Sequence, residues 1–325
     1  MDSVSQDAYL AVNDREKMCA TSLTQLRIAL TASWTARTAS PLVAWTPHNP
    51  SSGQCAVSAL VLQDYCGGEI CRCVVAGTPH YFNRIDDQVV DSTAAQFGTV
   101  AIDYDTSTVR SRQRILRHAD TRRRYELLKG QVERFLVELD AVAQAIGRVD
   151  YGHMGKDCLR DQTIWFGDTN SIVIVGEAPA RTGWVKSGVA WHDTAGKLLP
   201  SGIIMQKLLA ILGKELLAVT FIEAIKCFPS DRRYLKDLAA LYRPTLTQQL
   251  RILNPKLILT MGAIPTQALI EEPFRRLSDV VGRRYAMGES VVIPIFHPSP
   301  ISPRGYRDNV PIFEMIQRKM WEETP

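Results

Sequence analysis

The order of apolar and polar residues divides the chain into two parts that are built differently. From residue 171 onward, four short apolar runs each precede a segment with helical spacing. The runs are SIVIVG, AVTFIEAI, KLILTMG and SVVIPIFHP, and the helical segments lie near 195–212, 233–253, 263–271 and 307–321. Unbroken apolar runs are typical of strands buried on both faces. The pattern therefore predicts an α/β domain with a doubly wound, parallel, four-stranded sheet.

The N-terminal part has shorter and more mixed elements. A helix is expected near 14–33, and a second, apolar helix begins after the loop TPHNPSSGQC. Strand-like pieces follow around 69–76, 79–85 and 88–91. This mixture predicts a smaller α+β domain.

The segment that joins the two parts is helical in its spacing and strongly basic. Seven arginines lie between Arg110 and Arg124, although the formal net charge of the chain is only +4. Such a run suits the phosphate backbone of a nucleic acid, and it equally suits a solvated helix face. We expect an α+β domain over 1–105, a basic helical linker over 106–150 and the α/β domain over 151–325.

Cysteine usage and the lack of long apolar runs indicate a cytoplasmic protein without membrane contact. The chain has seven cysteines, and its start, MDSVSQDAYL, lacks the basic and apolar regions of a secretory signal. No apolar run approaches the roughly 18–20 residues that span a bilayer. Any important cysteine is therefore expected to act as a thiol nucleophile or metal ligand, because cytosolic thiols stay reduced.

Polar residues follow the predicted parallel strands at the points where these strands end. Glu177 comes after the first strand, Glu223 ends the second and His297 comes after the fourth. Ligands of open α/β sheets bind beyond the carboxyl ends of the strands. We therefore expect these three side chains to share one site.

Four motifs, GEAP, GVAWHDTAGKLL, EAIKCFPS and HPSP, occur in this order over residues 150–325. In order and spacing this half of the chain resembles the uracil-DNA glycosylase superfamily. GEAP resembles its family 4, and HPSP with the following Ser302 and Arg304-Gly305 resembles its family 1. The resemblance implies binding of DNA and hydrolysis of the N-glycosidic bond of a flipped-out nucleotide. No lysine stands where a Schiff-base nucleophile is expected, so the enzyme would be monofunctional.

The resemblance also implies roles for individual residues in catalysis and base binding. Glu177 matches the residue that activates water, and His297 matches the histidine that donates to the base O2 as negative charge develops there. Trp191 matches an aromatic ring that stacks on the flipped base, a contact worth about 1–3 kcal/mol. Gly176 and Glu223 would line the base-binding pocket.

A second group of residues is implied to contact DNA, namely Ser299, Ile301, Arg304, Arg307 and Lys226. Ser299 would grip a phosphate, and Ile301 would be the apolar wedge that fills the vacated base stack. For Ile301 and the two arginines, an ordinary position on a solvated surface is an equal alternative.

The sequence departs from the family pattern in two respects. Family 4 enzymes hold an iron–sulfur cluster on four cysteines, but here only Cys158 and Cys227 match, and Gly155 and Tyr242 take the other places. We expect no cofactor and no metal. The alternative is that His153 replaces one of the missing cysteine ligands.

The second departure concerns the base. The enzymes of this superfamily that recognise uracil have an Asn where this chain has Glu223. Unlike that amide, an ionised carboxylate only accepts hydrogen bonds. The expected target is therefore an amino-bearing, cytosine-type modified base, with uracil as the alternative.

The stretch WTPHNPSSGQCAVSALVLQDYCGGEI, followed by PHYFN and VVDSTAAQF, resembles the YunG-like family over about 40–100. Cys55 opens a helix, His80 starts a strand and Asp91 ends the next one, which is the order of a thiol catalytic site. Gln54 would suit an oxyanion donor. The alternative is a folded module with Cys55 in its core. Cys66, Cys71 and Cys73 fit no zinc pattern and are expected to be ordinary thiols.

These observations leave three functions open. The leading hypothesis is a DNA glycosylase joined to a YunG-like module. The second is a sensor of modified bases whose N-terminal Cys-His module is the effector. The third is a cysteine peptidase or amidase with a vestigial glycosylase fold. Protein partners cannot be named from the sequence.

Overall fold

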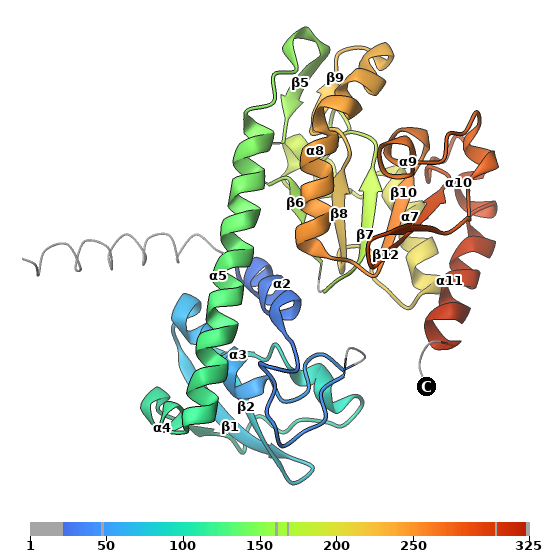
Figure 1. Cartoon of the computed structure of the whole chain (residues 1–325). Coiled ribbons are helices and arrows are strands. Elements are labelled where there is room, and N and C mark those ends of the chain that lie inside the picture. The colour runs from blue at the N-terminus through green and yellow to red at the C-terminus, as the bar shows by residue number, and fades with distance from the viewer. Residues whose placement is uncertain (1–21, 47–48, 160–161, 168, 303, 323–325) are drawn as a thin grey trace, which may run out of the picture. The chain divides into compact units, whose positions relative to one another are not determined.

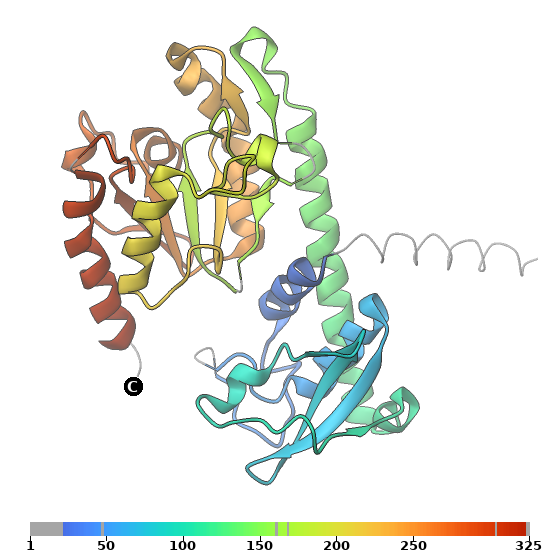
Figure 2. The same ribbon diagram turned by 180° about the vertical axis from the view of Figure 1, so that it is seen from behind.

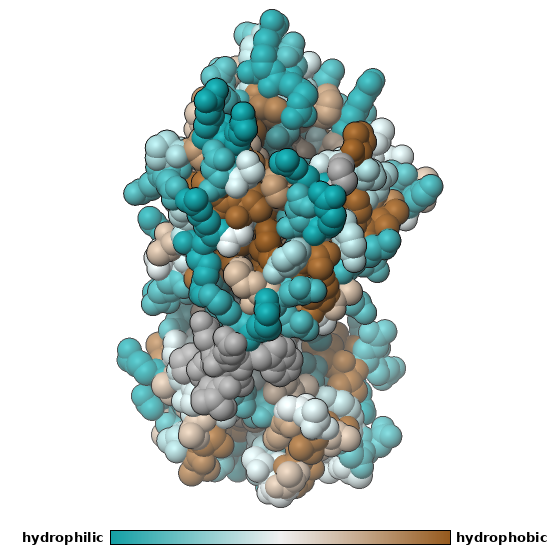
Figure 3. Space-filling model, turned by 90° about the vertical axis from the view of Figure 1, so that its right-hand side faces the viewer, coloured by the Kyte–Doolittle hydropathy of each residue, from teal (hydrophilic) through white to brown (hydrophobic). Residues whose placement is uncertain are grey.

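The computed structural model describes residues 22–46, 49–159, 162–167, 169–302 and 304–322. Its contacts divide the chain into two compact units, 1–136 and 137–325, which are described separately below (Figures 1 and 2). Within the described residues, no helix is long and apolar enough to cross a membrane. Figure 3 shows hydrophilic residues over much of one face, with apolar residues gathered in patches between them.

The N-terminal unit combines helices with an antiparallel sheet of strand order β3-β2-β1-β4. Its elements are α2 (Leu23–Ser33), α3 (Cys55–Cys66), β1 (Glu69–Val75), β2 (Thr78–Ile85), β3 (Gln88–Val90), η1 (Ala94–Phe97), β4 (Thr108–Val109) and α4 (Arg112–Leu116). The helix expected near 14–33 is described only from Leu23 onward, because residues 14–21 lie outside the described part of the chain.

Helix α3 packs against β2 and β1. Six consecutive residues, 57–62, are buried, which explains why this segment is apolar all around rather than on one stripe. The Asn83 amide of β2 donates to the backbone oxygen of Ala59 over 3.0 Å. This bond joins the helix to the sheet and so places Cys55, at the start of α3, beside the strand that carries His80.

The segment predicted as a separate linker is instead divided between the two units. The 29-residue helix α5 (Ala119–Gly147) runs across the boundary. Its first half buries Leu128 and Val132, and its second half contributes Val142 and Ile146 to a core of the C-terminal unit. The arginine run is also partly internal, since Arg124 is only 5 % exposed.

The C-terminal unit is built on a six-stranded sheet of order β11-β12-β10-β7-β8-β6. The strands are β6 (Ile164–Trp165), β7 (Thr169–Gly176), β8 (Val219–Glu223), β10 (Leu257–Met261), β11 (Tyr285–Met287) and β12 (Ser290–Ile295). β12, β10, β7 and β8 are parallel, and the outer strands β11 and β6 are antiparallel to their neighbours. The predicted parallel core is confirmed, and the structure adds an antiparallel strand at each edge.

Helices cover both faces of this sheet (Figures 1 and 2). α7 (Pro200–Ile211) packs against α11 (Val310–Glu322), and both contribute to one apolar core. α8 (Leu235–Leu253) packs against α9 (Ala263–Leu269), with buried residues of both in a second core.

Short elements connect these layers near the ends of the parallel strands. They are η2 (Gly152–Met154), α6 (Trp184–Ser187), η3 (Arg232–Tyr234), η4 (Leu277–Asp279), α10 (Arg304–Arg307) and the ribbon of β5 (Gly155–Cys158) with β9 (Cys227–Pro229). The predicted helix near 195–212 begins only at Pro200, a residue that suits the first turn because it has no backbone N–H to satisfy.

Gly167 provides a test of the tight backbone packing beside β8. A Cβ atom at this position would collide with the backbone oxygen and carbon of Ala218. We expect Gly167→Ala to lower the free energy of unfolding by about 2 kcal/mol or more, because backbone atoms cannot yield as a side chain does. Gly147→Ala is the matched control, since its Cβ would have no neighbour within 4 Å. Equal urea midpoints for the two variants would contradict the packing described.

Candidate active site

The carboxyl ends of the parallel strands surround a pocket of about 260 Å³. The chain passes from β7 to β8 on one side and then, through α8, from β8 to β10 on the other side of β7, so the strand order reverses here and the pocket lies where ligands of such sheets bind. Its lining includes Glu177, Glu223 and His297, which the structure thus brings together as expected from the strand ends.

Glu223 is the most unusual of these residues, because its carboxyl group is buried. The residue is 7 % exposed, and no hydrogen-bond partner for Oε2 is present among the described residues. Burial raises the pKa of Glu223 to about 8; the Lys226 ammonium opposes this rise and the Glu177 carboxylate adds to it. At neutral pH Glu223 therefore holds a proton, so one oxygen donates a hydrogen bond and the other accepts.

Gly176 makes room for this carboxyl. A Cβ on Gly176 would collide with Glu223 Oε2 and would lie 3.0 Å from the Phe221 ring. The pairing of β7 with β8 continues past both strands, since the Ile225 N–H donates to the Glu177 oxygen over 3.0 Å. The glycine at the head of the GEAP motif thus allows Glu223 to reach the pocket.

Lys226 is fully buried beneath this turn, so the DNA contact predicted for it is wrong. Its Nζ donates to the backbone oxygen of Glu223 and, over 2.6 Å, to Gln249 Oε1. The Gln249 amide in turn donates to Thr163 Oγ1 over 3.1 Å. Burial lowers the pKa of Lys226 to about 7, although the Glu223 carboxylate opposes this. The two acceptors bond the buried amine and hold the turn in place.

Glu177 lies at the mouth of the pocket with 25 % of its side chain exposed. Its Oε1 accepts from Arg232 Nη2 over 3.2 Å. Arg232 was missed by the sequence reasoning; its guanidinium is 79 % exposed, so the ion pair is weak and leaves the carboxylate accessible to water.

His297 follows β12 and is positioned by a buried residue that the sequence did not single out. Loss of solvation lowers the pKa of His297; the Glu177 carboxylate opposes this and Arg232 adds to it. A neutral imidazole carries one N–H donor. Asn309, which is fully buried, accepts from the Phe296 N–H over 3.0 Å and donates to the Phe296 oxygen over 2.8 Å. These two bonds fix the backbone directly before His297.

Aromatic rings form one wall of the pocket. Trp191 is 5 % exposed and its ring lies 4.5 Å, centre to centre, from Phe221. Trp184 and the half-buried Phe228 also line the pocket, and neither was predicted. The indole N–H groups of Trp184 and Trp191 have no partner among the described residues. The wall therefore offers flat apolar surface together with unused donors.

The predicted DNA-contacting loop lies on the surface next to His297. The side chain of Ile301 is 93 % exposed. Arg304 and Arg307 form exposed ion pairs with Asp308, at 3.8 and 2.9 Å. Ser299 Oγ accepts from the Ile301 N–H over 3.4 Å. An exposed apolar tip flanked by arginines suits a nucleic-acid surface, and the contacts themselves stay predictions.

The four positions that correspond to cluster ligands do meet in space. Cys158 pairs with Cys227 across the β5–β9 ribbon, and a Cβ at Gly155 would collide with Cys227 Sγ. Tyr242 is 1 % exposed in the same core. Two thiols and a tyrosine in filled space do not fit a cluster that takes four thiolates. Among the described residues, no group of three or more His, Cys, Asp or Glu could hold a metal ion.

The predicted thiol site of the N-terminal unit is also assembled. His80 Nε2 lies 2.6 Å from Asp91 Oδ2, and Cys55 is close enough to His80 to raise the pKa of the imidazole together with Asp91. Cys71 and Cys73 are buried, and burial raises the pKa of both thiols and of Cys66.

Comparisons with known proteins agree with the division into two units. Residues 22–137 match the model of the YunG protein family, and residues 165–320 match that of the uracil DNA glycosylase superfamily. The chain is 40 % identical over 72 residues to the protein YunG of Bacillus subtilis, a match that covers 22 % of this chain and 60 % of that protein.

Two type-4 uracil-DNA glycosylases are similar to the C-terminal unit. The protein of Sulfurisphaera tokodaii is 32 % identical over 136 residues, covering 39 % of this chain and 59 % of the relative. That of Pyrobaculum aerophilum is 31 % identical over 140 residues, covering 40 % and 67 %. The chain thus spans 59 to 67 % of the length of the curated relatives that it matches. With this similarity and the pocket at the strand ends, the chain belongs to the uracil-DNA glycosylase superfamily.

Proposed function

We propose that the C-terminal unit is a DNA glycosylase that hydrolyses the N-glycosidic bond of a flipped-out nucleotide. The observation that carries the proposal is the convergence of Glu177, Glu223 and His297 on one aromatic-walled pocket, in a unit that belongs to this superfamily. A pocket at the surface end of the sheet admits a base only after it has left the duplex stack, since its target atom is otherwise unreachable.

The chemistry follows from where charge develops. As the bond between the sugar C1′ and the base nitrogen breaks, the sugar becomes positive and the base negative. Glu177 balances the positive charge and takes a proton from the water that attacks C1′. The neutral His297 donates its N–H to the base O2, where negative charge gathers. No lysine lies among the described residues of the pocket lining, so the proposed enzyme releases the base without a covalent Schiff-base step.

Glu223 is proposed to read the base. Its protonated carboxyl can accept from the exocyclic amine of a cytosine-type base and donate to N3 of the same ring. When it is ionised it still accepts from the amine, but it repels the O4 of uracil. Uracil could be bound only by the protonated form, with O4 as the acceptor. An amino-bearing, cytosine-type base is therefore the proposed target.

The proposed enzyme holds no cofactor. Support comes from the filled space around Cys158, Cys227 and Tyr242, where the thiols are too few for a four-cysteine cluster. DNA is the proposed partner, with Ile301 and Arg304 on the surface that faces it.

A second candidate is a sensor that binds a modified base without excising it and whose effector is the N-terminal unit. It is favoured by the assembled His80–Asp91 pair next to Cys55. The two candidates differ in whether an abasic site is formed.

Glu177→Gln tests the reaction. We expect the variant to release base about 10²- to 10⁴-fold more slowly, because the amide cannot accept a proton from water. The measurement is alkali-labile cleavage of oligonucleotides that carry uracil or 5-substituted cytosines. Glu289→Gln, a change at an exposed glutamate, is the matched control and should keep full activity. Tight binding without any abasic product in the unaltered protein would favour the sensor instead.

Glu223 predicts a pH dependence that identifies the base. Uracil binding needs the protonated carboxyl, so any uracil release should be present below pH about 8 and fall as Glu223 ionises above it. Cytosine-type release should fall less, because the ionised form still accepts from the amine. Glu223→Gln should remove this dependence, and Glu223→Asn should shift preference toward uracil. Robust uracil release with no cytosine activity would contradict the proposed target.

A further inference from the structure

The N-terminal unit contains a second pocket, of about 490 Å³, that opens over Cys55. From its chemistry we propose that this unit is a cysteine-dependent acyl-transfer enzyme, acting on an amide or ester whose acyl part carries a carboxylate. Cys55 would be the nucleophile, His80 the acid and base, and Asp91 the residue that positions His80. The proposal concerns a different unit from the glycosylase site and does not depend on it.

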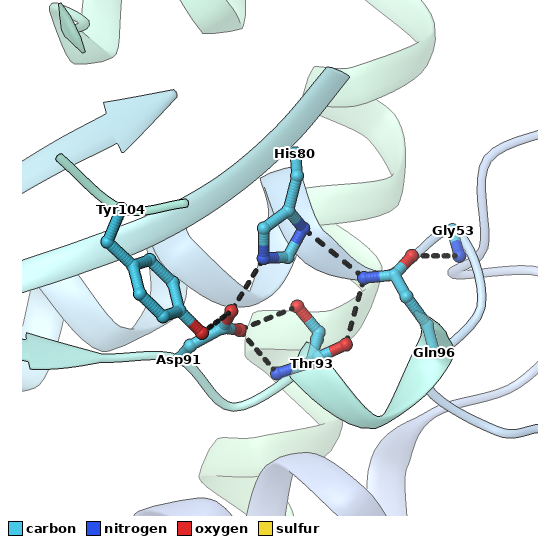
Figure 4. A network of polar contacts seen from close by, with 6 residues as sticks. All are labelled: Gly53, His80, Asp91, Thr93, Gln96 and Tyr104. Carbon is cyan, nitrogen blue, oxygen red and sulfur yellow. Dashed lines mark hydrogen bonds and ion pairs between the residues drawn. The ribbon is translucent and has the colours of Figure 1, made fainter. Parts of the chain in front are cut away.

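The proposal rests first on the contact between His80 and Asp91 (Figure 4). Asp91 Oδ2 lies 2.6 Å from His80 Nε2 and accepts from the Tyr104 hydroxyl over 3.1 Å. Its other oxygen, Oδ1, accepts from the Thr93 N–H over 2.9 Å and from the Thr93 hydroxyl over 3.2 Å. A carboxylate with this many donors is held in one orientation.

The ring of His80 is equally constrained. It is fully buried, and the ring of Phe97 meets it edge-on at 4.9 Å between centres. With Nε2 turned to Asp91, the other ring nitrogen, Nδ1, lies 3.4 Å from the Gln96 amide and is available to the Cys55 thiol. Burial alone would lower the pKa of His80, but its hydrogen bonds to Asp91 and Cys55 raise it to about 9. The imidazole is therefore charged at neutral pH.

The position of Cys55 suits a nucleophile. It is the first residue of α3, it is half-buried and it lines the pocket. The first N–H groups of a helix have no partner within the helix, so the backbone there can stabilise an oxyanion. One N–H of the Gln54 amide donates to the Thr35 oxygen over 3.0 Å, which leaves its second N–H for the oxyanion role expected from the sequence.

The charge of the pocket indicates the substrate. Arg72, Arg110, Arg114, Arg124 and His118 line it, and no Asp or Glu does so among the described residues. Arg124 is neutralised by Asp120, with 2.6 Å between Nε and Oδ2. The half-buried Arg72 and Arg110 have no ion-pair partner among the described residues. Cations held beside a nucleophile without a counter-charge favour an anionic substrate.

The reaction balances with water as the only co-reactant. In the pair formed by the Cys55 thiolate and the His80 imidazolium, the sulfur forms a bond to the acyl carbon, the bond from that carbon to the leaving nitrogen or oxygen breaks, and the imidazolium gives its proton to the leaving atom. Water then attacks the thioester, its proton returns to His80, and the carbon–sulfur bond breaks to release the acid.

Two alkylating agents of nearly equal size test the nucleophile and the charge together in the full-length protein. Iodoacetamide is neutral and iodoacetate is an anion, and peptide mass spectrometry gives the labelling rate of each cysteine. We expect Cys55 to react at least about ten-fold faster than Cys66, whose thiol has a raised pKa. The ratio of iodoacetate to iodoacetamide rates should exceed that of free glutathione. Uniform labelling, or a ratio equal to that of glutathione, would overturn the proposal.

Variants separate the two parts of the proposal. Arg72→Gln with Arg110→Gln should lower the ratio of the iodoacetate rate to the iodoacetamide rate at Cys55 toward that of glutathione. Cys55→Ala should abolish turnover of para-nitrophenyl hemisuccinate and of its neutral counterpart, para-nitrophenyl butyrate. Because His80 is fully buried, these variants at half-buried positions carry the test instead of His80→Ala. If added duplex DNA blocks the labelling of Cys55, the pocket is a phosphate-binding site and the proposal fails.

Asp91→Asn tests the positioning role. Asp91 and Cys55 are the charged or titratable groups that face His80, and Tyr104 and Cys73 stand beside Asp91. An asparagine can still orient the ring but removes the charge that raises the pKa of His80. The pH profile of hemisuccinate turnover should therefore shift to lower pH while turnover persists; an unchanged profile would rule out this role.

Discussion

The C-terminal site depends on the burial of one carboxyl group at the end of a parallel strand. Moving an ionised carboxylate out of water is costly, and Glu223 avoids that cost by keeping its proton. Gly176 leaves space for the group, and Lys226 holds the turn below it through the Glu223 backbone oxygen and Gln249. The same constraint places an O–H donor in the pocket, so the packing of the turn and the proposed recognition of a base depend on the same buried group.

The sequence was sufficient to predict the parallel core and not its edges. β7, β8, β10 and β12 are unbroken apolar runs, because helices cover both of their faces. β6 and β11 have only two or three residues, which is too short for any periodicity to appear. The predicted linker, 106–150, also differs from the structure, in which the boundary between the two units lies within α5. The spacing of α5 shows a helix, but not that its two halves pack into different cores.

The candidate site was predictable wherever strand ends determine position. Glu177, Glu223 and His297 met because parallel strands end at a common edge. Lys226 was misplaced because a charged residue in a turn suggests a surface cation, and only the fold shows that its side chain points inward to Gln249. Asn309 could not be found, since an asparagine before a helix has the same appearance whether it caps the helix or holds a neighbouring loop.

The two units leave their titratable groups in different charge states, and the difference follows from their surroundings. In the pocket of the C-terminal unit, loss of solvation raises the pKa of Glu223 and lowers that of His297, and both groups are neutral at neutral pH. In the thiol pocket the Asp91 carboxylate outweighs burial, so His80 is charged. A pocket of neutral donors and acceptors suits a nucleobase, which has no charge to pair. A pocket of uncompensated cations suits an anion. The electrostatics of each unit thus argue for a separate substrate, and not for one ligand acted on twice.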